Sequence, residues 1–292
     1  MQRTFITGDK WLYYKLYCGE KTADLLLTDV IKPVCGFLLA KKWIDKWFFI
    51  RYVDPKYHIR LRLLLPDNKN FTPVITTIFN EINPYVASGL INKVQTDTYK
   101  REIERYGSSS IELSEALFHI ESEMIVDFMN LLEGNEGEKI RWLFSMKYID
   151  TLLSNFNYST VEKFELMKPV ADSFGKEFNL NSSLIKQLSN KYRKYKKDIL
   201  NFMKDDFLTM NYGEILFLLK SKSNRSKTYV ELILNYSKNG KLEIPLNNLL
   251  FSYMHMFMNR LFRSKQRVHE LVIYGFMFRY YRTQLAKEKY NK

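Results

Sequence analysis

The chain has 292 residues, 46% of them hydrophobic and 15% aromatic, which is enough apolar material for a large core. Its formal net charge of +13 attracts anions of several classes, including nucleic acid, acidic peptide and anionic lipid. The sequence has no apolar run long enough to span a bilayer and no signal-peptide pattern at its start, so we expect a globular, cytoplasmic protein.

Several kinds of chemistry lose support from patterns that the sequence lacks. The two cysteines, Cys18 and Cys35, have no further cysteine or histidine at metal-binding spacing, which predicts neither a disulfide nor a zinc site. The patterns GxxxxGK, GxGxxG, HExxH and GxSxG do not occur. We therefore expect no metal site, and nucleotide or serine chemistry is not favoured.

The first third of the chain mixes strand and helix patterns. Short aromatic or alternating segments predict strands, and apolar residues three to four apart predict helices. In chain order, the predicted elements are a strand over 11–19, a helix over 22–42 with a kink at Pro33, two strands over 46–53 and 58–65 joined by a turn, a helix over 71–83 and a strand over 89–99.

From about residue 110 the pattern is almost entirely helical. Ser109 or Ser110, followed by acidic residues, predicts a capping box at the start of a helix that runs to about 133. Later helix breaks are predicted at 134–137, 181–183, 211–213 and 237–248. The sequence therefore predicts an α+β protein of one domain, 1–292, in which a mixed or antiparallel sheet lobe (about 1–108) packs on a helical lobe (about 109–292).

The predicted hairpin carries several cations. If its turn closes over 54–57, Arg51 faces Arg60, and Arg51, His58, Arg60 and Arg62 share one face while apolar side chains occupy the other. Like charges directly opposite each other on a sheet are unfavourable, so a source of negative charge should compensate them.

Two interpretations of this cationic face stay open. An internal carboxylate such as Glu112, Glu115 or Glu121 could pair with the arginines, or solvent could screen them. Alternatively, the face binds a substrate carboxylate or phosphate, because guanidinium presents a planar fork of donors to such groups.

Other candidate residues lie in three later segments. Arg105 precedes a glycine-containing loop whose free backbone N–H groups, just before a helix, favour anions. His255 and Asn259 share a face of an apolar helix, a setting typical of a satisfied core histidine but also of one tuned for proton transfer. Glu270, next to His269, is either a surface residue or one that orients a catalytic group.

Two basic segments, 191–197 and 279–292, carry much of the positive charge. At helical spacing such segments most often form solvated faces. An RNA-facing patch is the alternative.

A series of ordered motifs resembles a known family. After an aromatic strand near the N-terminus come "WFFIRYVDPKYHIRLR" (47–62), "DTYKREIERYG" (97–107), a helix with "SEALF" (114–118) and "HMFMNR" (255–260). Over about residues 11–281 this order is similar to the C-terminal domain of class I lantibiotic dehydratases, a family that includes thiopeptide-type bacteriocin biosynthesis proteins. In two-domain members the N-terminal domain transfers glutamate from glutamyl-tRNA to Ser or Thr of a precursor peptide. The C-terminal domain then eliminates the glutamate, leaving dehydroalanine or dehydrobutyrine.

The resemblance implies a lyase activity and particular site residues for it. The family's essential arginines correspond to Arg62 and Arg105, and its essential histidine to His255, which we expect to be catalytic. Elimination calls for such groups, because guanidinium binds the glutamate and the developing enolate while a histidine moves the proton. The supporting or substrate-binding residues expected beside them are Arg51, His58, Arg60, Arg260 and Glu270. The family often has two glycines after the Arg-Tyr pair, where this chain has Gly107 and Ser108, so the position of Arg105 stays open.

The resemblance also implies partners and alternatives. The expected substrate is a glutamylated precursor peptide that binds in extended form, as at a sheet edge. A separate tRNA-dependent glutamylating subunit and a cyclase are expected in a split system, elimination needs no cofactor, and a homodimer stays open. The alternatives are a [4+2] cycloaddition enzyme that closes a thiopeptide macrocycle and a non-catalytic scaffold that grips the peptide. The co-occurrence of Arg62, Arg105 and His255 favours elimination.

Overall fold

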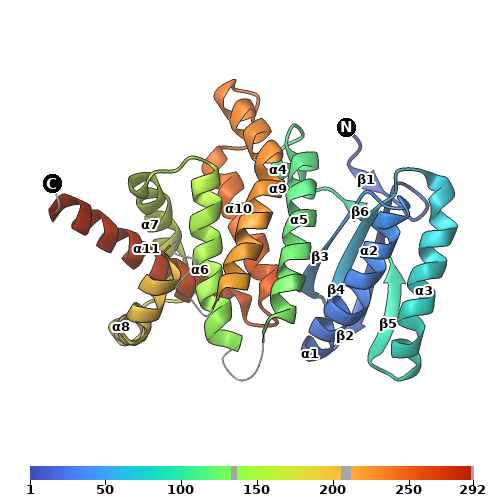
Figure 1. Cartoon of the computed structure of the whole chain (residues 1–292), viewed down its shortest axis with the longest axis horizontal. Coiled ribbons are helices and arrows are strands. Elements are labelled where there is room, and N and C mark those ends of the chain that lie inside the picture. Colours follow the sequence, from blue (N-terminus) through green and yellow to red (C-terminus); the bar gives the residue numbers. More distant parts are fainter. Residues whose placement is uncertain (133–136, 205–211, 291–292) are drawn as a thin grey trace. The chain divides into compact units, whose positions relative to one another are not determined.

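The chain folds around a four-stranded antiparallel sheet with strand order β3-β4-β2-β5 (Figure 1). The computed structural model describes residues 1–132, 137–204 and 212–290. The sheet strands are β2 (Trp11–Cys18), β3 (Lys46–Val53), β4 (Tyr57–Leu64) and β5 (Ile91–Thr96). A second antiparallel pair joins β1 (Thr4–Phe5) to β6 (Tyr99–Lys100). Helices form most of the rest, which confirms the expected α+β class.

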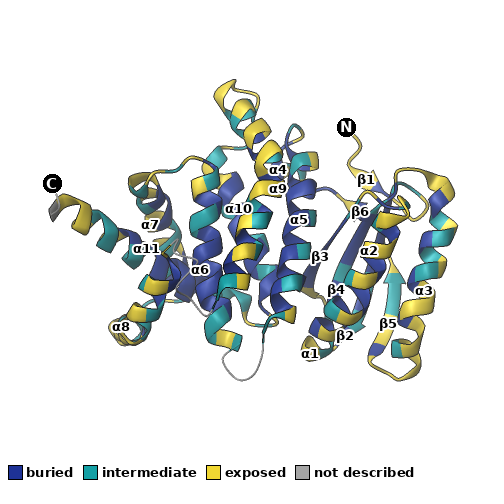
Figure 2. Ribbon diagram, viewed as in Figure 1, coloured by how far each residue is buried: buried dark blue, intermediate teal, exposed yellow. Residues whose placement is uncertain are grey.

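Helices from the N-terminal part of the chain cover one face of this sheet. They are α1 (Glu20–Leu26), a π-helical turn (Leu27–Ile31), α2 (Lys32–Ala40) and α3 (Phe71–Ala87). The kink predicted at Pro33 is this wider turn, because proline has no N–H to donate to the carbonyl four residues earlier. Val34 and Ile78 of the helices line the same small cavity as Leu16 and Leu61 of the sheet, and the strand residues there are largely buried (Figure 2).

The hairpin register differs by one residue from the predicted register. Val53 pairs with Tyr57 and Arg51 pairs with Ile59, because three residues rather than four separate β3 from β4. A shift of one residue moves a side chain to the other face of a sheet. The prediction that all four hairpin cations share a face is therefore wrong, since Arg51 lies with the apolar residues. The remaining cations lie together on the opposite face: His58, Arg60 and Arg62.

Side chains of two helices close the outer edge of β3. These helices are α5 (Ile111–Asn130) and α10 (Leu246–Leu261). The Phe49 N–H donates to Ser122 Oγ at 3.3 Å, the Arg51 N–H donates to Asn259 Oδ1 at 3.0 Å, and Asn259 Nδ2 donates back to the Arg51 carbonyl at 2.8 Å. These backbone N–H and carbonyl groups at the edge of β3 are thus already hydrogen-bonded and are not available to pair with another strand.

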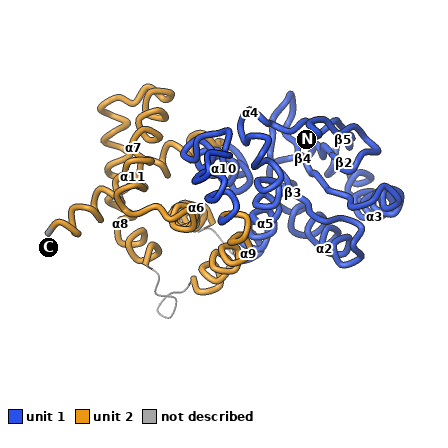
Figure 3. Tube along the Cα trace, turned by 90° about the horizontal axis from the view of Figure 1, so that it is seen from above, with its two compact units in different colours: residues 1–131, 231–264 blue, residues 132–230, 265–292 orange. Residues whose placement is uncertain are grey.

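Contacts divide the chain into two compact units (Figure 3). Unit 1 comprises residues 1–131 and 231–264, and unit 2 comprises residues 132–230 and 265–292. This division differs from the predicted lobes, because α5 and α10 pack against the sheet and so belong to its unit.

Unit 2 is helical in the part that the structure describes. Its elements are α6 (Gly137–Asn155), α7 (Thr160–Glu177), α8 (Ser182–Phe202), most of α9 (Gly213–Lys238) and α11 (Gln266–Tyr290). The predicted breaks at 181–183 and 237–248 are confirmed. Residues 134–136 and 211 of the other two predicted breaks lie outside the described residues, and α9 begins at Gly213. The described helices include no candidate for a membrane-spanning segment.

Candidate functional site

One face of the sheet, opposite the side that meets α1 to α3, combines aromatic rings with cations. The strand registers place alternate residues of three strands there. We call this surface the aromatic–cationic face, and it consists of Tyr13, Lys15, Tyr17, Phe48, Ile50, Tyr52, His58, Arg60 and Arg62.

Arg62 is the buried centre of this face, with only 8% of its surface exposed. Its guanidinium carbon lies 4.6 Å from the ring centre of Tyr13, 5.3 Å from that of Phe48 and 4.7 Å from that of Tyr99. We call these three rings the aromatic cage. Among the described residues, Arg62 has no hydrogen bond or carboxylate partner, and its buried Nε is unsatisfied. Such a buried cation is costly unless an anion pairs with it.

The acidic residues expected to neutralise the hairpin bind other arginines. Arg101 donates from Nε and Nη2 to the two oxygens of Glu115, each at 2.7 Å, and from Nη1 to Glu112 at 3.1 Å. Arg260 Nη1 donates to Glu121 at 2.5 Å. The internal-carboxylate interpretation therefore does not account for the caged arginine.

A second unsatisfied donor lies beside the same cage. The buried indole Nε1–H of Trp11 has no acceptor in the described part of the chain. Its ring lies 5.5 Å from that of Phe48 and 5.3 Å from that of Tyr99. Two buried donors without acceptors at one cage are what a bound carboxylate would satisfy. The only signal for Trp11 in the sequence is its place in an aromatic strand.

The other end of the face holds His58 and Arg60. The His58 Nδ1 lies 2.8 Å from the Lys56 carbonyl, and Arg60 Nε donates to His58 Nε2 at 3.2 Å. The Arg60 guanidinium carbon stacks 3.4 Å from the ring centre of Tyr52. Burial lowers the pKa of His58, and the charge of Arg60 adds to this effect. His58 therefore serves as a neutral acceptor that orients Arg60.

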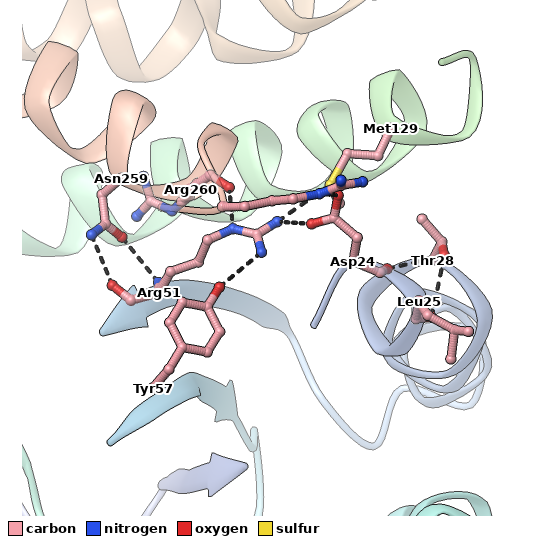
Figure 4. A network of polar contacts seen from close by, with 9 residues as sticks. Asp24, Leu25, Thr28, Arg51, Tyr57, Met129, Asn259 and Arg260 are labelled. Carbon is pink, nitrogen blue, oxygen red and sulfur yellow. Dashed lines mark hydrogen bonds and ion pairs between the residues drawn. The ribbon is translucent and has the colours of Figure 1, made fainter. Parts of the chain in front are cut away.

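Arg51, on the opposite face, is fully engaged by protein groups (Figure 4). Its Nε donates to the Arg260 carbonyl at 2.8 Å, its Nη1 to the Tyr57 hydroxyl at 3.0 Å and its Nη2 to Asp24 at 2.6 Å. These bonds satisfy a buried cation within the fold. Arg260 is likewise buried and donates from Nε to the Phe49 carbonyl at 2.8 Å.

Arg105 lies in the short helix α4 (Ile103–Tyr106). Its side chain is 43% exposed and its Nε is 3.3 Å from Glu102. The next residue, Tyr106, is buried and stacks on the ring of Tyr253 at 6.2 Å. Arg105 is thus an accessible cation anchored by a buried neighbour.

An internal carboxylate occupies the loop that follows Arg105. The Ser108 N–H donates to Glu243 Oε2 at 2.6 Å, and the Ser108 hydroxyl also donates to Glu243. Gly107 has φ of +73° and would bring a Cβ to 3.4 Å from Glu243, so glycine suits this position. The predicted capping box is wrong, because the Ser110 side chain caps no N–H and instead bonds the Tyr106 carbonyl.

His255 lies on α10, where its ring is 6.5 Å from that of Phe251. A step of two residues turns a helix by about 200°, so His255 and Tyr253 project from different sides of α10. Within the described residues, Arg62 and Arg105 form no hydrogen bond or ion pair with each other or with His255. All three belong to unit 1.

Glu270 belongs to unit 2 and is fully buried. It accepts hydrogen bonds from Arg267 Nη1 at 3.0 Å and from the Tyr274 hydroxyl at 3.1 Å. The adjacent His269 accepts the indole N–H of Trp142 at 3.0 Å. The pair is therefore part of the packing of unit 2 and not a surface pair.

The profile of a family described as "Lantibiotic biosynthesis dehydratase C-term" matches residues 11–281. The chain belongs to this family. The assignment confirms the expected resemblance.

Two curated relatives agree with the assignment. The chain is 26% identical over 220 residues to the nisin biosynthesis protein NisB of Lactococcus lactis subsp. lactis. The aligned region covers 72% of this chain and 22% of that protein. It is 32% identical over 122 residues to the subtilin biosynthesis protein SpaB of Bacillus subtilis, or 40% of this chain and 11% of that protein. The chain thus spans about a fifth or less of the relatives that it matches.

Solved structures share the fold at low sequence identity. The tRNA-dependent lantibiotic dehydratase MibB from Microbispora sp. 107891 matches 93% of this chain and 28% of its own, with a TM-score of 0.71 and 17% identity. The pyridine synthase TbtD from thiomuracin biosynthesis matches 94% of this chain and 99% of its own, with a TM-score of 0.68 and 11% identity. TsrL matches 97% of this chain and 95% of its own, with a TM-score of 0.66 and 13% identity.

Proposed function

We propose that this chain removes glutamate from glutamylated Ser or Thr residues of a ribosomally made precursor peptide, leaving dehydroalanine or dehydrobutyrine. The observation that carries the proposal is the state of Arg62, a buried guanidinium that has no anionic partner among the described residues. A glutamate carboxylate would supply that partner through two parallel hydrogen bonds. The aromatic cage adds attraction for the cation and excludes water from the pair.

The proposed reaction is a β-elimination. A base takes the Cα proton of the modified residue, the Cβ–O bond breaks, and the electron pair leaves on the carboxylate of glutamate. Negative charge develops on the enolate and then on the leaving group. Donors held in a buried setting stabilise such charge without reorganising, which is where Arg62 would lower the barrier.

Arg105 and His255 keep the roles that the resemblance implies. Arg105, an exposed cation of unit 1, would bind the glutamate or the enolate, and His255 would move the proton. Arg60, oriented by His58, would add positive charge on the face of Arg62. We assign the remaining candidates to the stability of the fold, because each forms an ion pair within the protein, which Arg62 does not among the described residues. The pairs are Arg51 with Asp24, Arg260 with Glu121 and Glu270 with Arg267.

The precursor peptide would dock on β5. The edge of β3 is closed by side chains of α5 and α10, whereas β5 ends the sheet on the other side, and no strand lies beyond it among the described residues. Asn92, Lys93 and Thr96 of β5 are exposed. An added strand would bind through main-chain hydrogen bonds, which tolerate many peptide sequences.

A split pathway is part of the proposal. In it a separate subunit glutamylates the peptide, this chain eliminates the glutamate, and a cyclase follows. The match to TbtD favours a second candidate, a cycloaddition that joins two dehydroalanines, because that pyridine synthase is covered over 99% of its length.

Two peptide substrates separate these functions. Purified protein is incubated with a glutamylated precursor peptide and, in parallel, with a peptide that already contains two dehydroalanines. Elimination predicts free glutamate and a peptide lighter by one glutamic acid in the first reaction. A macrocycle in the second reaction, with the first peptide unchanged, would overturn elimination in favour of cycloaddition.

A further inference from the structure

Most of the excess positive charge belongs to unit 2. Its two segments contain 24 Lys and Arg against 14 Asp and Glu, a net charge of +10. Unit 1 contains 21 against 18, a net charge of +3. The charge that steers anions toward a protein is therefore concentrated away from the unit that holds Arg62.

Helices α8 and α11 form a pocket of about 580 Å³ within this unit. Among the residues that the structure describes, no carboxylate lines it, and Tyr280, Gln284 and Asn201 add an aromatic ring and amides. Five cations line it: Arg193, Lys196, Lys197, Lys204 and Lys287.

These cations have no carboxylate partners in the described part of the chain. Asp198, which lies among them on α8, pairs instead with Lys139, with 2.9 Å between Nζ and Oδ2. The cations also repel their neighbours. Burial lowers the pKa of Arg279 on α11, and the positive charges of Arg282 and Arg193 lower it further. Like charges gathered in this way are unfavourable unless an external anion neutralises them.

The arrangement of the five cations in this pocket favours the phosphate chain of a nucleic acid over a peptide rich in Asp and Glu. Arg193 and Asn201, which both line the pocket, are separated by about 12 Å along the axis of α8, a distance that passes several phosphates of a nucleic acid strand. The backbone N–H groups in α8 and α11 are engaged within their helices, so a peptide main chain would find no strand edge there. Lysines and an arginine near an aromatic ring are typical contacts to an RNA backbone and its bases.

We propose that the basic pocket between α8 and α11 is an RNA-binding site that contacts the phosphate backbone. The affinity should fall steeply with salt, because each neutralised phosphate releases counterions. The site does not depend on the chemistry proposed at Arg62. The Arg62→Met variant should therefore bind RNA as the unaltered protein does.

Fluorescence anisotropy with a labelled RNA hairpin tests the proposal. The variant Lys196→Gln/Lys197→Gln/Lys204→Gln removes three exposed cations from the pocket. It should weaken binding more than tenfold and reduce the slope of log affinity against log salt by about 2 to 3, at about 0.9 for each lost phosphate contact. Circular dichroism checks that it folds.

A matched variant removes the same charge elsewhere on unit 2. Lys168→Gln/Lys176→Gln/Lys186→Gln alters exposed lysines that do not line the pocket, and it should keep nearly full affinity. Equal losses in both variants would mean attraction to net charge alone and would overturn the site. Absence of RNA binding, or stronger competition by polyglutamate than by unlabelled RNA, would also overturn it, the latter in favour of an acidic peptide.

Discussion

Arg51 and Arg62 project from one hairpin but lie on opposite faces of its sheet. Arg51 donates to Asp24, to the Tyr57 hydroxyl and to the Arg260 carbonyl. Arg62 instead lies among aromatic rings, and the described residues provide no acceptor for it. Two residues of the same type and similar burial are thus expected to differ in role, one stabilising the fold and one binding a ligand.

Replacement of each arginine by methionine separates these roles. Methionine fills the space without the charge, so Arg62→Met should reduce glutamate release at least about 100-fold, as loss of one transition-state donor does. Its midpoint of urea unfolding should stay the same or rise, because an unpaired buried charge has been removed. Arg51→Met should lower the free energy of unfolding by about 3 kcal/mol, because it leaves Asp24 partly unpaired in the interior.

The contrast between the two variants is the control. A marked loss of stability in Arg62→Met would show that the cage needs the cation for folding. Unchanged glutamate release from a folded Arg62→Met protein would remove the main support for the proposed site.

Local patterns in the sequence were sufficient to predict much of the fold. The strand at 11–19, the hairpin, the helix from 71 and the long helix after 110 all correspond to observed elements, because apolar periodicity is set by which face is buried. The face of Arg51 was not predictable in this way. It depends on whether the connection has three or four residues, a choice that strand propensity does not determine.

The candidate site shows the same limit more strongly. Arg62 could be named from the hairpin, but its neighbours Trp11 and Tyr99 are distant in sequence and converge only through the sheet and β6. In the loop that follows Arg105, the hydrogen bond from the Ser108 N–H to Glu243 joins residues 135 positions apart in the sequence. A missed helix break at 156–159 had a local signal, because Ser159 and Glu162 form a capping box.

Asn259 should contribute to stability through the edge of β3. Its side chain both accepts from the Arg51 N–H and donates to the Arg51 carbonyl. Asn259→Ala removes two hydrogen bonds and leaves edge groups unsatisfied, so the free energy of unfolding should fall by about 2 kcal/mol. Ser122→Ala removes one hydrogen bond to the Phe49 N–H. Urea unfolding should show that it lowers the free energy of unfolding about half as much as Asn259→Ala does. Equal stability of Asn259→Ala and the unaltered protein would contradict the role of this side chain.

His58 should make stability depend on pH. Burial lowers its pKa in the folded protein below the ordinary value of 6.5, so the unfolded chain binds more protons between these two values. Stability is then lost as the pH falls through about 6.5 toward the lower folded value. When urea unfolding is measured between about pH 7 and pH 5, the free energy of unfolding should fall less steeply with decreasing pH in His58→Gln than in the unaltered protein. Burial also lowers the pKa of His269, so His269→Gln should weaken the pH dependence of stability in the same way. The double variant should show the weakest pH dependence of the three. A decline as steep in His58→Gln as in the unaltered protein would contradict this coupling.

Hydrogen exchange can locate the peptide on the sheet. If the precursor peptide adds to β5, backbone amides within 91–96 should exchange more slowly when a saturating glutamylated peptide is present, because new main-chain hydrogen bonds form there. Amides of β3 (46–53) serve as the internal control. Their edge is already occupied by Ser122 and Asn259, so they should exchange at the same rate with and without peptide.

The two edges make the outcome decisive, because they belong to one sheet and experience the same global stability. A general tightening of the fold by the ligand would slow exchange in both strands. Slower exchange in β5 alone would identify the docking edge, and the side chains of Lys93 and Gln95, which pair with Tyr17 and Lys15 on the aromatic–cationic face, would then lie next to the bound peptide. Protection confined to other segments would contradict docking on β5 while leaving the carboxylate role of Arg62 to be judged by glutamate release.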